Sequence, residues 1–237
     1  TPMTLLSLTP DDVGAPLLQV DVAIVGGGVI GLSTAYYCAK AGYSVTVIDR
    51  NPPARNGCSF GNAGMVVPSH FIPLAAPGMV ALGLKWMWNP ESPFYIRPRF
   101  DPQLFEWGWR FWRASTAERV QKAAPLLRDI SMASRAAFEE LAALPHFDFG
   151  LVKKGLLMLC RSQHALDEEA HTATQSRALG IPADVLDARQ TAALDPAITM
   201  TVAGSVHFPQ DCHLSPDRFM AGLQHELERL AGGVVEG

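Results

Sequence analysis

The segment Val20-Asp-Val-Ala-Ile-Val-Gly-Gly-Gly-Val-Ile-Gly31 points to the fold, because in it a glycine-rich turn directly follows a short apolar run. Residues 20–25 are apolar and rich in β-branched side chains, a pattern that predicts a strand buried on both faces. Residues 32–41 predict a helix that ends at Gly42, and residues 43–48 predict a second strand. The three elements form one βαβ unit, whose crossover we expect to be right-handed.

The glycines of this turn match the pattern G-x-G-x-x-G, and each has its own physical role. Gly26 makes the tight turn from strand to helix, and Gly28 lets backbone amides approach a pyrophosphate. Gly31 permits close packing of the helix on the strand. The helix begins near Val29 and Ile30, and its positive end would hold the diphosphate of a dinucleotide.

An acidic residue stands where a dinucleotide-binding unit requires one. Asp49 lies at the end of the second predicted strand, followed by Arg50. A carboxylate there can accept hydrogen bonds from both ribose hydroxyls and would repel a 2′-phosphate, which argues against NADP. The alternative is a purely structural βαβ unit in which Asp49 is a solvated turn residue.

The glycine pattern by itself fits NAD and FAD equally well, since both contain an ADP half. The distinguishing feature is the loop over residues 51–64, which is rich in Pro, Gly, Asn and Ser. Its end, Ser59-Phe-Gly-Asn-Ala-Gly64, supplies small residues and free amides that could wrap the far half of a dinucleotide. A turn-rich loop without a ligand is the competing interpretation.

Composition excludes several classes of protein. The chain has 237 residues, of which 48% are hydrophobic and 18% charged, with a net charge of −4. An acidic chain without a basic face is a poor partner for nucleic acid. The apolar stretch over residues 71–84 is interrupted by prolines and too short to span a membrane. The four cysteines are widely separated and favour a reducing compartment, so we expect the cytoplasm. They are Cys38, Cys58, Cys160 and Cys212.

Aromatic residues are concentrated in the middle of the chain. All five tryptophans fall between residues 86 and 112, at Trp86, Trp88, Trp107, Trp109 and Trp112. The favoured interpretation is that these rings pack the core of a second domain. A substrate cleft, a quinone-bearing membrane surface and a protein-docking surface are the alternatives. The nearby arginines are interpreted as solvated; they are Arg97, Arg99, Arg110 and Arg113.

Further helices and an extended segment follow in the second half of the chain. Residues 115–144 predict a long helix, and the sequence does not decide whether Pro125 breaks it. Asp187 predicts the cap of a short helix, and Ser215-Pro216 predicts the start of a helix that runs to residue 230. Residues 147–161 are expected to be extended, residues 163–179 form an amphipathic helix ended by Gly180, and Val234-Val235 begin another strand.

The chain resembles the D-amino-acid oxidase superfamily, and within it the bacterial D-amino-acid dehydrogenases of small-subunit type. The resemblance rests on the glycine turn, on Val47-Ile-Asp-Arg50 and on Cys58-Ser-Phe-Gly-Asn-Ala-Gly-Met65. It continues at Gly155-Leu-Leu-Met-Leu159 and at Pro209-Gln-Asp-Cys-His-Leu-Ser-Pro216. The Ser-x-x-Asn-Ala-Gly loop is the narrowest of these motifs, because many flavoproteins share the glycine turn.

The resemblance implies FAD as cofactor, with its ADP half on the glycine turn and its flavin half near the loop. The implied contacts are Gly26, Gly28, Val29, Ile30, Gly31, Asp49, Arg50, Cys58, Ser59, Asn62, Ala63, Gly64 and Met65. The implied reaction is hydride transfer from the amine-bearing carbon to flavin N5, followed by hydrolysis of the imine to a 2-oxo acid and ammonia. No catalytic residue and no metal site is assigned.

The expected fold is α/β and α+β, with a Rossmann-like FAD-binding domain of the GR2 flavoprotein type and a mixed substrate domain. We expect an irregular leader over 1–18, the FAD-binding part over 19–70, the substrate or cap domain over 71–205, and an incomplete return to the FAD-binding domain over 206–237. Members of the superfamily are longer, so the chain is interpreted as an N-terminal part.

Several functions stay open at this point. Glycine, sarcosine-like and proline-type amines are alternative substrates, and either oxygen or a quinone is the electron acceptor. An NAD-dependent dehydrogenase and a non-catalytic FAD-binding subunit are further alternatives. Peripheral contact with the inner membrane and assembly into an oligomer are also left open.

Overall fold

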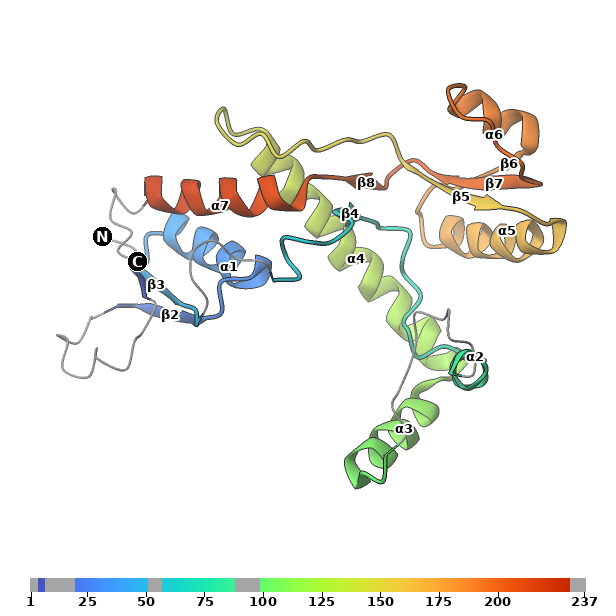
Figure 1. Cartoon of the computed structure of the whole chain (residues 1–237), viewed down its shortest axis with the longest axis horizontal. Coiled ribbons are helices and arrows are strands. Elements are labelled where there is room, and N and C mark those ends of the chain that lie inside the picture. Colours follow the sequence, from blue (N-terminus) through green and yellow to red (C-terminus); the bar gives the residue numbers. More distant parts are fainter. Residues whose placement is uncertain (1–3, 7–19, 51–56, 88–98, 231–237) are drawn as a thin grey trace. The chain divides into compact units, whose positions relative to one another are not determined.

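The computed structural model describes residues 4–6, 20–50, 57–87 and 99–230 (Figure 1). Contacts between Cα atoms divide the chain into two units. The first contains the described residues within 1–66, 137–152 and 212–237, and the second those within 67–136 and 153–211. The segment 137–152, placed by the sequence prediction in the substrate domain, thus packs with the first unit.

The first unit is built on a parallel three-stranded sheet. Its strands are β1 (Thr4–Leu6), β2 (Val22–Val25) and β3 (Val45–Ile48), in the spatial order β1-β3-β2. Helix α1 (Val29–Lys40) connects β2 to β3, which pair in register from Val22 beside Val45 to Val25 beside Ile48. Gly42 ends the helix with a φ of +94°, as the sequence predicted. The Rossmann-like βαβ unit is therefore confirmed.

Two details of this sheet correct the sequence predictions. Strand β2 is not buried on both faces, because the Val25 side chain is 87% exposed. Among the described residues β2 pairs with β3 alone, and α1 packs beside it, so its outer edge stays open. Residues Thr4–Leu6 lie within the segment predicted to be an irregular leader, yet they form β1. The main-chain groups of β3 pair with β1 along the edge that faces away from β2.

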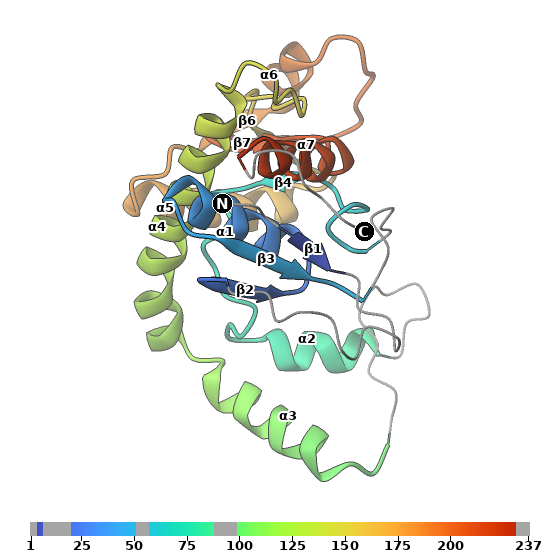
Figure 2. The same ribbon diagram turned by 90° about the vertical axis from the view of Figure 1, so that its left-hand side faces the viewer.

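Helix α7 (Pro216–Leu230) packs on α1 and adds a further layer over the sheet (Figures 1 and 2). Its start fits the predicted cap, since Ser215 accepts the Phe219 N–H with its carbonyl oxygen. The Ser215 hydroxyl, however, donates to the Asp217 carboxylate at 2.7 Å. The predicted strand at 234–235 lies outside the described residues. Fully buried side chains from α1, β3 and α7 form the core of this unit: Leu32, Ala35, Val45, Val47, Met220, Leu223 and Leu227.

A short antiparallel pair links the loop after β3 to the start of α7. Strand β4 (Met65–Val66) pairs with β8 (Cys212–His213), with Met65 opposite His213 and Val66 opposite Cys212. The residues that follow β8 lead directly into α7. The glycine-rich loop and the last described helix are therefore connected through main-chain hydrogen bonds that join distant parts of the sequence.

The second unit contains an antiparallel sheet of β5 (Leu156–Cys160), β6 (Asp184–Asp187) and β7 (Gly204–Phe208), in the order β5-β7-β6. Helices α5 (Gln163–Ala178) and α6 (Ala188–Leu194) lie on opposite sides of it (Figure 1). The predicted cap is confirmed, because the Asp187 carboxylate accepts the Gln190 N–H at 2.7 Å. Gly180 follows α5 with a φ of +80°.

Three helices precede this sheet: α2 (Met79–Trp86), α3 (Pro102–Ala114) and α4 (Ala117–Ala142). The break left open at Pro125 does not occur, since α4 continues through that residue. Asp101 caps α3 by accepting the Gln103 N–H at 2.9 Å, with Pro102 in the first helical position. In the described part of the chain no helix combines the length and the apolar character needed to cross a bilayer.

The aromatic residues of α3 do not fill a core, so the favoured sequence interpretation is wrong for this helix. Trp107, Trp109 and Trp112 are 48%, 54% and 62% exposed, and Phe105 is 64% exposed. No residue of α3 is buried. The aromatic side chains occupy more of the helix circumference than the described part of the unit covers. Trp88 and Arg97 lie outside the described residues.

A buried carboxylate fastens the segment after β4 to the turn before β8. The Asp211 carboxylate, 1% exposed as a residue, accepts the Ser69 N–H at 3.1 Å and the Ser69 hydroxyl at 2.5 Å. Burial raises the pKa of Asp211 above its ordinary 3.8, although the bonds from Ser69 and the charges of His70 and Arg135 act in the opposite direction. The desolvation of this carboxylate is therefore only partly compensated.

The raised pKa of Asp211 gives a test by pH. Its contribution to folding stability is fully present below the ordinary pKa of 3.8 and is lost as pH rises through the folded-state value. An Asp211→Asn variant still accepts the Ser69 N–H with its amide oxygen, its amide nitrogen can donate to the Ser69 hydroxyl oxygen, and it carries no charge. We expect the free energy of unfolding of this variant to rise relative to the unchanged protein as pH increases above about 4. Urea unfolding at several pH values measures this difference, with exposed Asp167→Asn as control. A flat or falling difference would contradict it.

Candidate cofactor site

The glycine turn has a geometry that only glycine tolerates at two of its positions. Gly26 has a φ of +101°, and its N–H donates to the Ile48 carbonyl at 2.7 Å. A Cβ on Gly31 would overlap the Gly26 carbonyl oxygen and lie 3.3 Å from a methyl carbon of Ile24. The absence of side chains therefore lets α1 start directly against the end of β2.

The start of α1 is a suitable place for an anion. Gly28 is the cap residue and offers no side-chain acceptor, and the first turn contains no acidic residue. The first amides of a helix have no partner within it and carry the positive end of its dipole. The Val29 N–H donates to the Ser59 hydroxyl at 3.1 Å. The amides of Ile30 and Gly31 belong to the same turn, where a diphosphate would accept hydrogen bonds.

Asp49 lies against the turn rather than out in solvent. One of its carboxylate oxygens accepts the Gly27 N–H at 2.6 Å, and Asp49 is only partly exposed. This bond fixes the carboxylate at the edge of the turn, beside the helix start. A carboxylate has about four lone-pair sites, so a bond from Gly27 is compatible with ribose hydroxyls as further donors. The neighbouring Arg50 is exposed.

The end of the loop is held in shape by its own asparagine. The Asn62 side chain donates to the carbonyls of Cys58 and Ser59 at 3.0 and 3.1 Å, and its oxygen accepts the Gly64 N–H at 2.8 Å. Asn62, which the sequence predicts as a cofactor contact, thus holds the loop in shape through hydrogen bonds to neighbouring main-chain groups. Such local bonds are typical of asparagine in turns. The loop presents Ser59 to the helix start as a consequence.

Gly64 joins this loop to the residues before α7. It has a φ of +63°, and a Cβ there would overlap the Leu214 carbonyl oxygen. The Leu214 N–H donates to the Gly64 carbonyl at 2.9 Å. Sequence reasoning did not predict Leu214 as a partner, because main-chain pairing leaves no side-chain signature. The spacing of the Gly64 motif pointed only to a turn.

The remaining predicted contacts lie at the surface of the same loop. Cys58 and Ala63 are exposed, and Met65 is 45% exposed on β4. The structure therefore brings the glycine turn, Asp49 and Ser59 together, and places Cys58, Ala63 and Met65 on the outer part of the loop. In the described residues no set of three His, Cys, Asp or Glu side chains is arranged to hold a metal ion. The contacts with a cofactor remain predictions.

This arrangement fits the diphosphate and adjacent ribose of a dinucleotide. Gly26, Gly28 and Gly31 leave a space beside the turn that side chains would occupy. A Cβ on Gly28, for example, would lie 3.2 Å from the Ser59 hydroxyl oxygen. Backbone amides, a positive helix end and one carboxylate are the groups that such a ligand requires. The candidate site would supply binding and orientation; no general acid or base is assigned in it.

Comparison with known proteins agrees with this geometry. A family model described as DAO, FAD dependent oxidoreductase, matches residues 21–237. D-amino acid dehydrogenase 2 of Ralstonia nicotianae is 33% identical over 202 residues, which cover 82% of this chain and 48% of that protein. The D-amino acid dehydrogenase of Allorhizobium ampelinum is 35% identical over 193 residues, which cover 80% of this chain and 46% of that protein.

The crystal structure of glycine oxidase from Geobacillus kaustophilus superimposes with a TM-score of 0.61. It is 23% identical and is matched over 92% of this chain and 46% of that chain, a likeness that shows the fold alone. The chain spans about half the length of the curated relatives it matches.

Substitution of Gly64 tests whether the loop must meet Leu214. We expect Gly64→Ala to destabilise the protein by about 1–3 kcal/mol, because alanine at this φ is strained and its Cβ meets a carbonyl oxygen. FAD retention on gel filtration should fall with it. Gly61→Ala is the control, since a Cβ there meets nothing within 4 Å. Equal thermal unfolding of the two variants would contradict this assignment.

Substitution of Ser59 tests the connection between the loop and α1. Ser59→Ala removes the acceptor of the Val29 N–H without adding bulk. We expect FAD to bind about fivefold more weakly, which corresponds to one hydrogen bond of about 1 kcal/mol. Fluorescence titration with FAD measures the affinity, and Ser162→Ala at the start of α5 controls for loss of a serine elsewhere. An unchanged affinity would exclude Ser59 from the site.

Proposed function

The chain belongs to the DAO family of FAD-dependent oxidoreductases, and we propose that it carries the FAD-binding part of an enzyme that oxidises the C–N bond of D-amino acids. The observation that carries this proposal is the closed arrangement of glycine turn, Asp49 and Ser59 loop in a chain whose relatives include D-amino acid dehydrogenases at 33–35% identity. The solved glycine oxidase supports the fold but not the choice of substrate.

The residues of the chain would act by binding and orientation. The amides at the start of α1 would hold the diphosphate, and Asp49 would accept hydrogen bonds from the ribose. Ser59 and the amides near Gly64 would line the path towards the flavin end. When bound, FAD accepts at N5 the hydride that leaves the amine-bearing carbon of the substrate.

The substrate changes would balance without a strong protein base. The amine enters in its neutral form and loses a hydride from carbon, and a proton then leaves the nitrogen to give an imine. Water adds to the imine, and a 2-oxo acid and ammonia result. No residue of the described chain is assigned to proton transfer.

The Asp49 position also bears on which nucleotide is accepted. Its carboxylate lies beside the turn amides, where a 2′-phosphate on the ribose would meet a negative charge. We therefore propose FAD and not NADP as the ligand. The cysteines of the chain are free thiols, which fits a reducing compartment and supports the cytoplasm as the proposed location of the protein; they are Cys38, Cys58, Cys160 and Cys212. Oxygen or a quinone would receive the electrons.

Anaerobic addition of substrate tests the reaction directly. Purified protein loaded with FAD should lose the visible absorption of oxidised flavin when a D-amino acid is added, and should keep it when the L-enantiomer is added. Air or a soluble quinone, added afterwards in separate samples, should restore the absorption and identify the acceptor. Thermal-shift assays should show stabilisation by FAD and none by NADP.

The outcomes separate the alternatives. Bleaching by glycine, sarcosine or proline, without bleaching by D-amino acids, would assign a different amine. Protein that holds FAD but is bleached by none of these compounds would be a non-catalytic FAD-binding subunit. Protein that takes up NAD and no FAD would overturn the proposal.

A further inference from the structure

The pairing of β4 with β8 is too short to be rigid by itself. It consists of two residue pairs, Met65 opposite His213 and Val66 opposite Cys212. A two-stranded ribbon of this length has little stability of its own, so its ends must be held by other contacts. The loop that carries Ser59 leads directly into β4, and its place beside the start of α1 therefore depends on how firmly β4 is held.

One end of this pair is held by main-chain contacts. The Leu214 N–H donates to the Gly64 carbonyl at 2.9 Å, and the close approach leaves no room for a Cβ on Gly64. On the other edge of β8, the main-chain groups of His213 exchange two hydrogen bonds with Val152, at 2.8 and 3.1 Å. Among the described residues β8 is therefore paired on both edges, whereas β4 pairs with β8 alone.

The other end of the pair is held by the side chains of Asp211 and Ser69. Main-chain pairing stops at Val66, and the chain turns there, since the His70 N–H donates to the Val67 carbonyl at 3.0 Å. The Asp211 carboxylate, directly before β8, accepts the N–H and the hydroxyl of Ser69 inside this turn, at 3.1 and 2.5 Å. Both residues are buried. We refer to these two hydrogen bonds as the Asp211–Ser69 clamp.

The main chain of Asp211 is itself fixed in place. Its N–H donates to the Phe208 carbonyl at 3.2 Å, and its carbonyl accepts the Gly155 N–H at 3.1 Å. Burial keeps away the water that would compete for hydrogen bonds to the carboxylate, and bonds to a charged acceptor are stronger than bonds between neutral groups. The clamp therefore ties the turn after β4 to a rigid part of the chain.

We propose that Asp211 and Ser69 are positioning residues, which hold the loop over residues 57–64 in the conformation that binds FAD. The proposal rests on the proposed function and adds two residues that lie outside the glycine turn and the loop. With the clamp intact, β4 is held at both ends and Ser59 stays beside the Val29 amide. Without it, β4 separates from β8 in part of the molecules. The apparent affinity for FAD then falls in proportion to the fraction of molecules that keep the binding conformation.

Three variants and a matched control separate the clamp from general effects on folding. Asp211→Ala removes both hydrogen bonds of the clamp, and Ser69→Ala removes one of them. Asp211→Asn is the conservative variant, because its amide group can form hydrogen bonds with both the N–H and the hydroxyl oxygen of Ser69. Ser176→Ala is the control, since it removes another buried serine hydroxyl, which donates to the Ile181 carbonyl at 3.1 Å and takes no part in the clamp.

Two measurements on these proteins test the positioning role, both made well below the unfolding temperature of each variant. In fluorescence titrations we expect FAD to bind about tenfold more weakly to Asp211→Ala and about threefold more weakly to Ser69→Ala. Asp211→Asn and Ser176→Ala should bind FAD as the unchanged protein does. In the FAD-free protein, amide hydrogen exchange over residues 57–66, measured by mass spectrometry, should be faster in Asp211→Ala than in Asp211→Asn.

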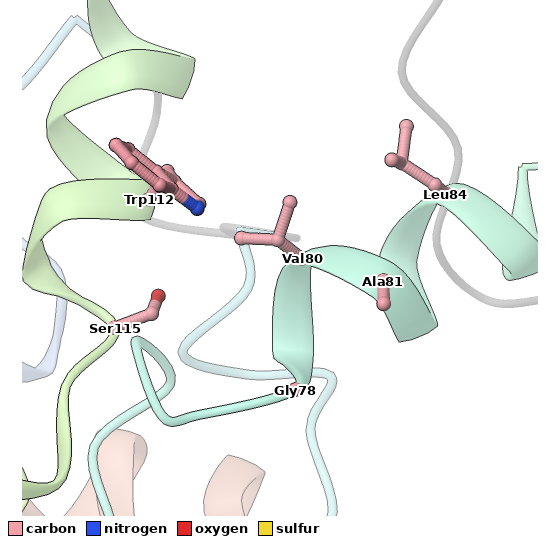
Figure 3. A pocket seen from close by; sticks show the side chains of 6 residues that line it. All are labelled: Gly78, Val80, Ala81, Leu84, Trp112 and Ser115. Atoms are coloured by element: carbon pink, nitrogen blue, oxygen red, sulfur yellow. The ribbon is translucent and has the colours of Figure 1, made fainter.

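Tryptophan emission shows whether the rest of the second unit is intact. The chain after Ser69 leads to α2, and the Trp112 indole of α3 lies towards Val80 of α2 across a pocket of about 300 Å³ (Figure 3). All five tryptophans lie between residues 86 and 112, so the emission of the FAD-free protein reports on this region. We expect the same emission maximum for Ser69→Ala and for the unchanged protein, because the clamp acts on the turn after β4.

The positioning role is overturned if Asp211→Ala binds FAD as tightly as Asp211→Asn, or if hydrogen exchange over residues 57–66 is equal in the two. It is also overturned if Ser176→Ala loses as much affinity as Ser69→Ala, or if the emission of Ser69→Ala shifts, because the effect is then a general loss of order. Where Asp211→Ala does not fold, Ser69→Ala takes its place in each comparison. An unchanged protein that binds no FAD overturns the proposed function instead, and hydrogen exchange in the FAD-free protein then decides whether the clamp orders the loop.

Discussion

The close approach of α1 to the end of β2 is the constraint on which the first unit depends. It exists because Gly31 has no Cβ to meet the carbonyl oxygen of Gly26. The approach places the first amides of α1 beside the end of the sheet, and the Gly27 amide within 2.6 Å of Asp49. Helix α7 then packs on α1, so the core of the unit builds on the same geometry.

A second contact holds the loop over residues 57–64 beside the start of α1, where the candidate site lies. Gly64 meets the main chain of Leu214, and β4 pairs with β8 next to it. Ser59 reaches the amide of Val29 from this anchored loop. The segments involved are distant in sequence, and the hydrogen bonds between them are mostly main-chain. This explains how a surface loop of small residues can keep one shape beside the helix start.

The two units use polar and aromatic residues differently. In the first, Phe138, Phe147, Phe149 and Phe219 pack on one another with ring centroids 5.0–6.4 Å apart. In the second, Trp109 and Trp112 are more than half exposed, and a carboxylate, Asp211, is buried instead. Aromatic content alone therefore does not indicate a core, since the second unit buries Phe71 and Phe208 but leaves the indoles of Trp109 and Trp112 in contact with solvent.

Sequence patterns alone predict the βαβ unit, the cap at Asp187, the helix starting at Pro216 and the residues of the glycine turn. These features depend on neighbours a few residues apart, where strand and helix periodicity, glycine and capping side chains act locally. Four features became visible only in the folded chain. Asn62 organises its own loop, Gly64 contacts Leu214, Val25 is exposed and the α3 tryptophans face solvent. These features depend on which segments pack together. Main-chain pairing between distant segments, and the covering of one side of a strand or helix by its neighbours, leave no pattern of residue types along the chain.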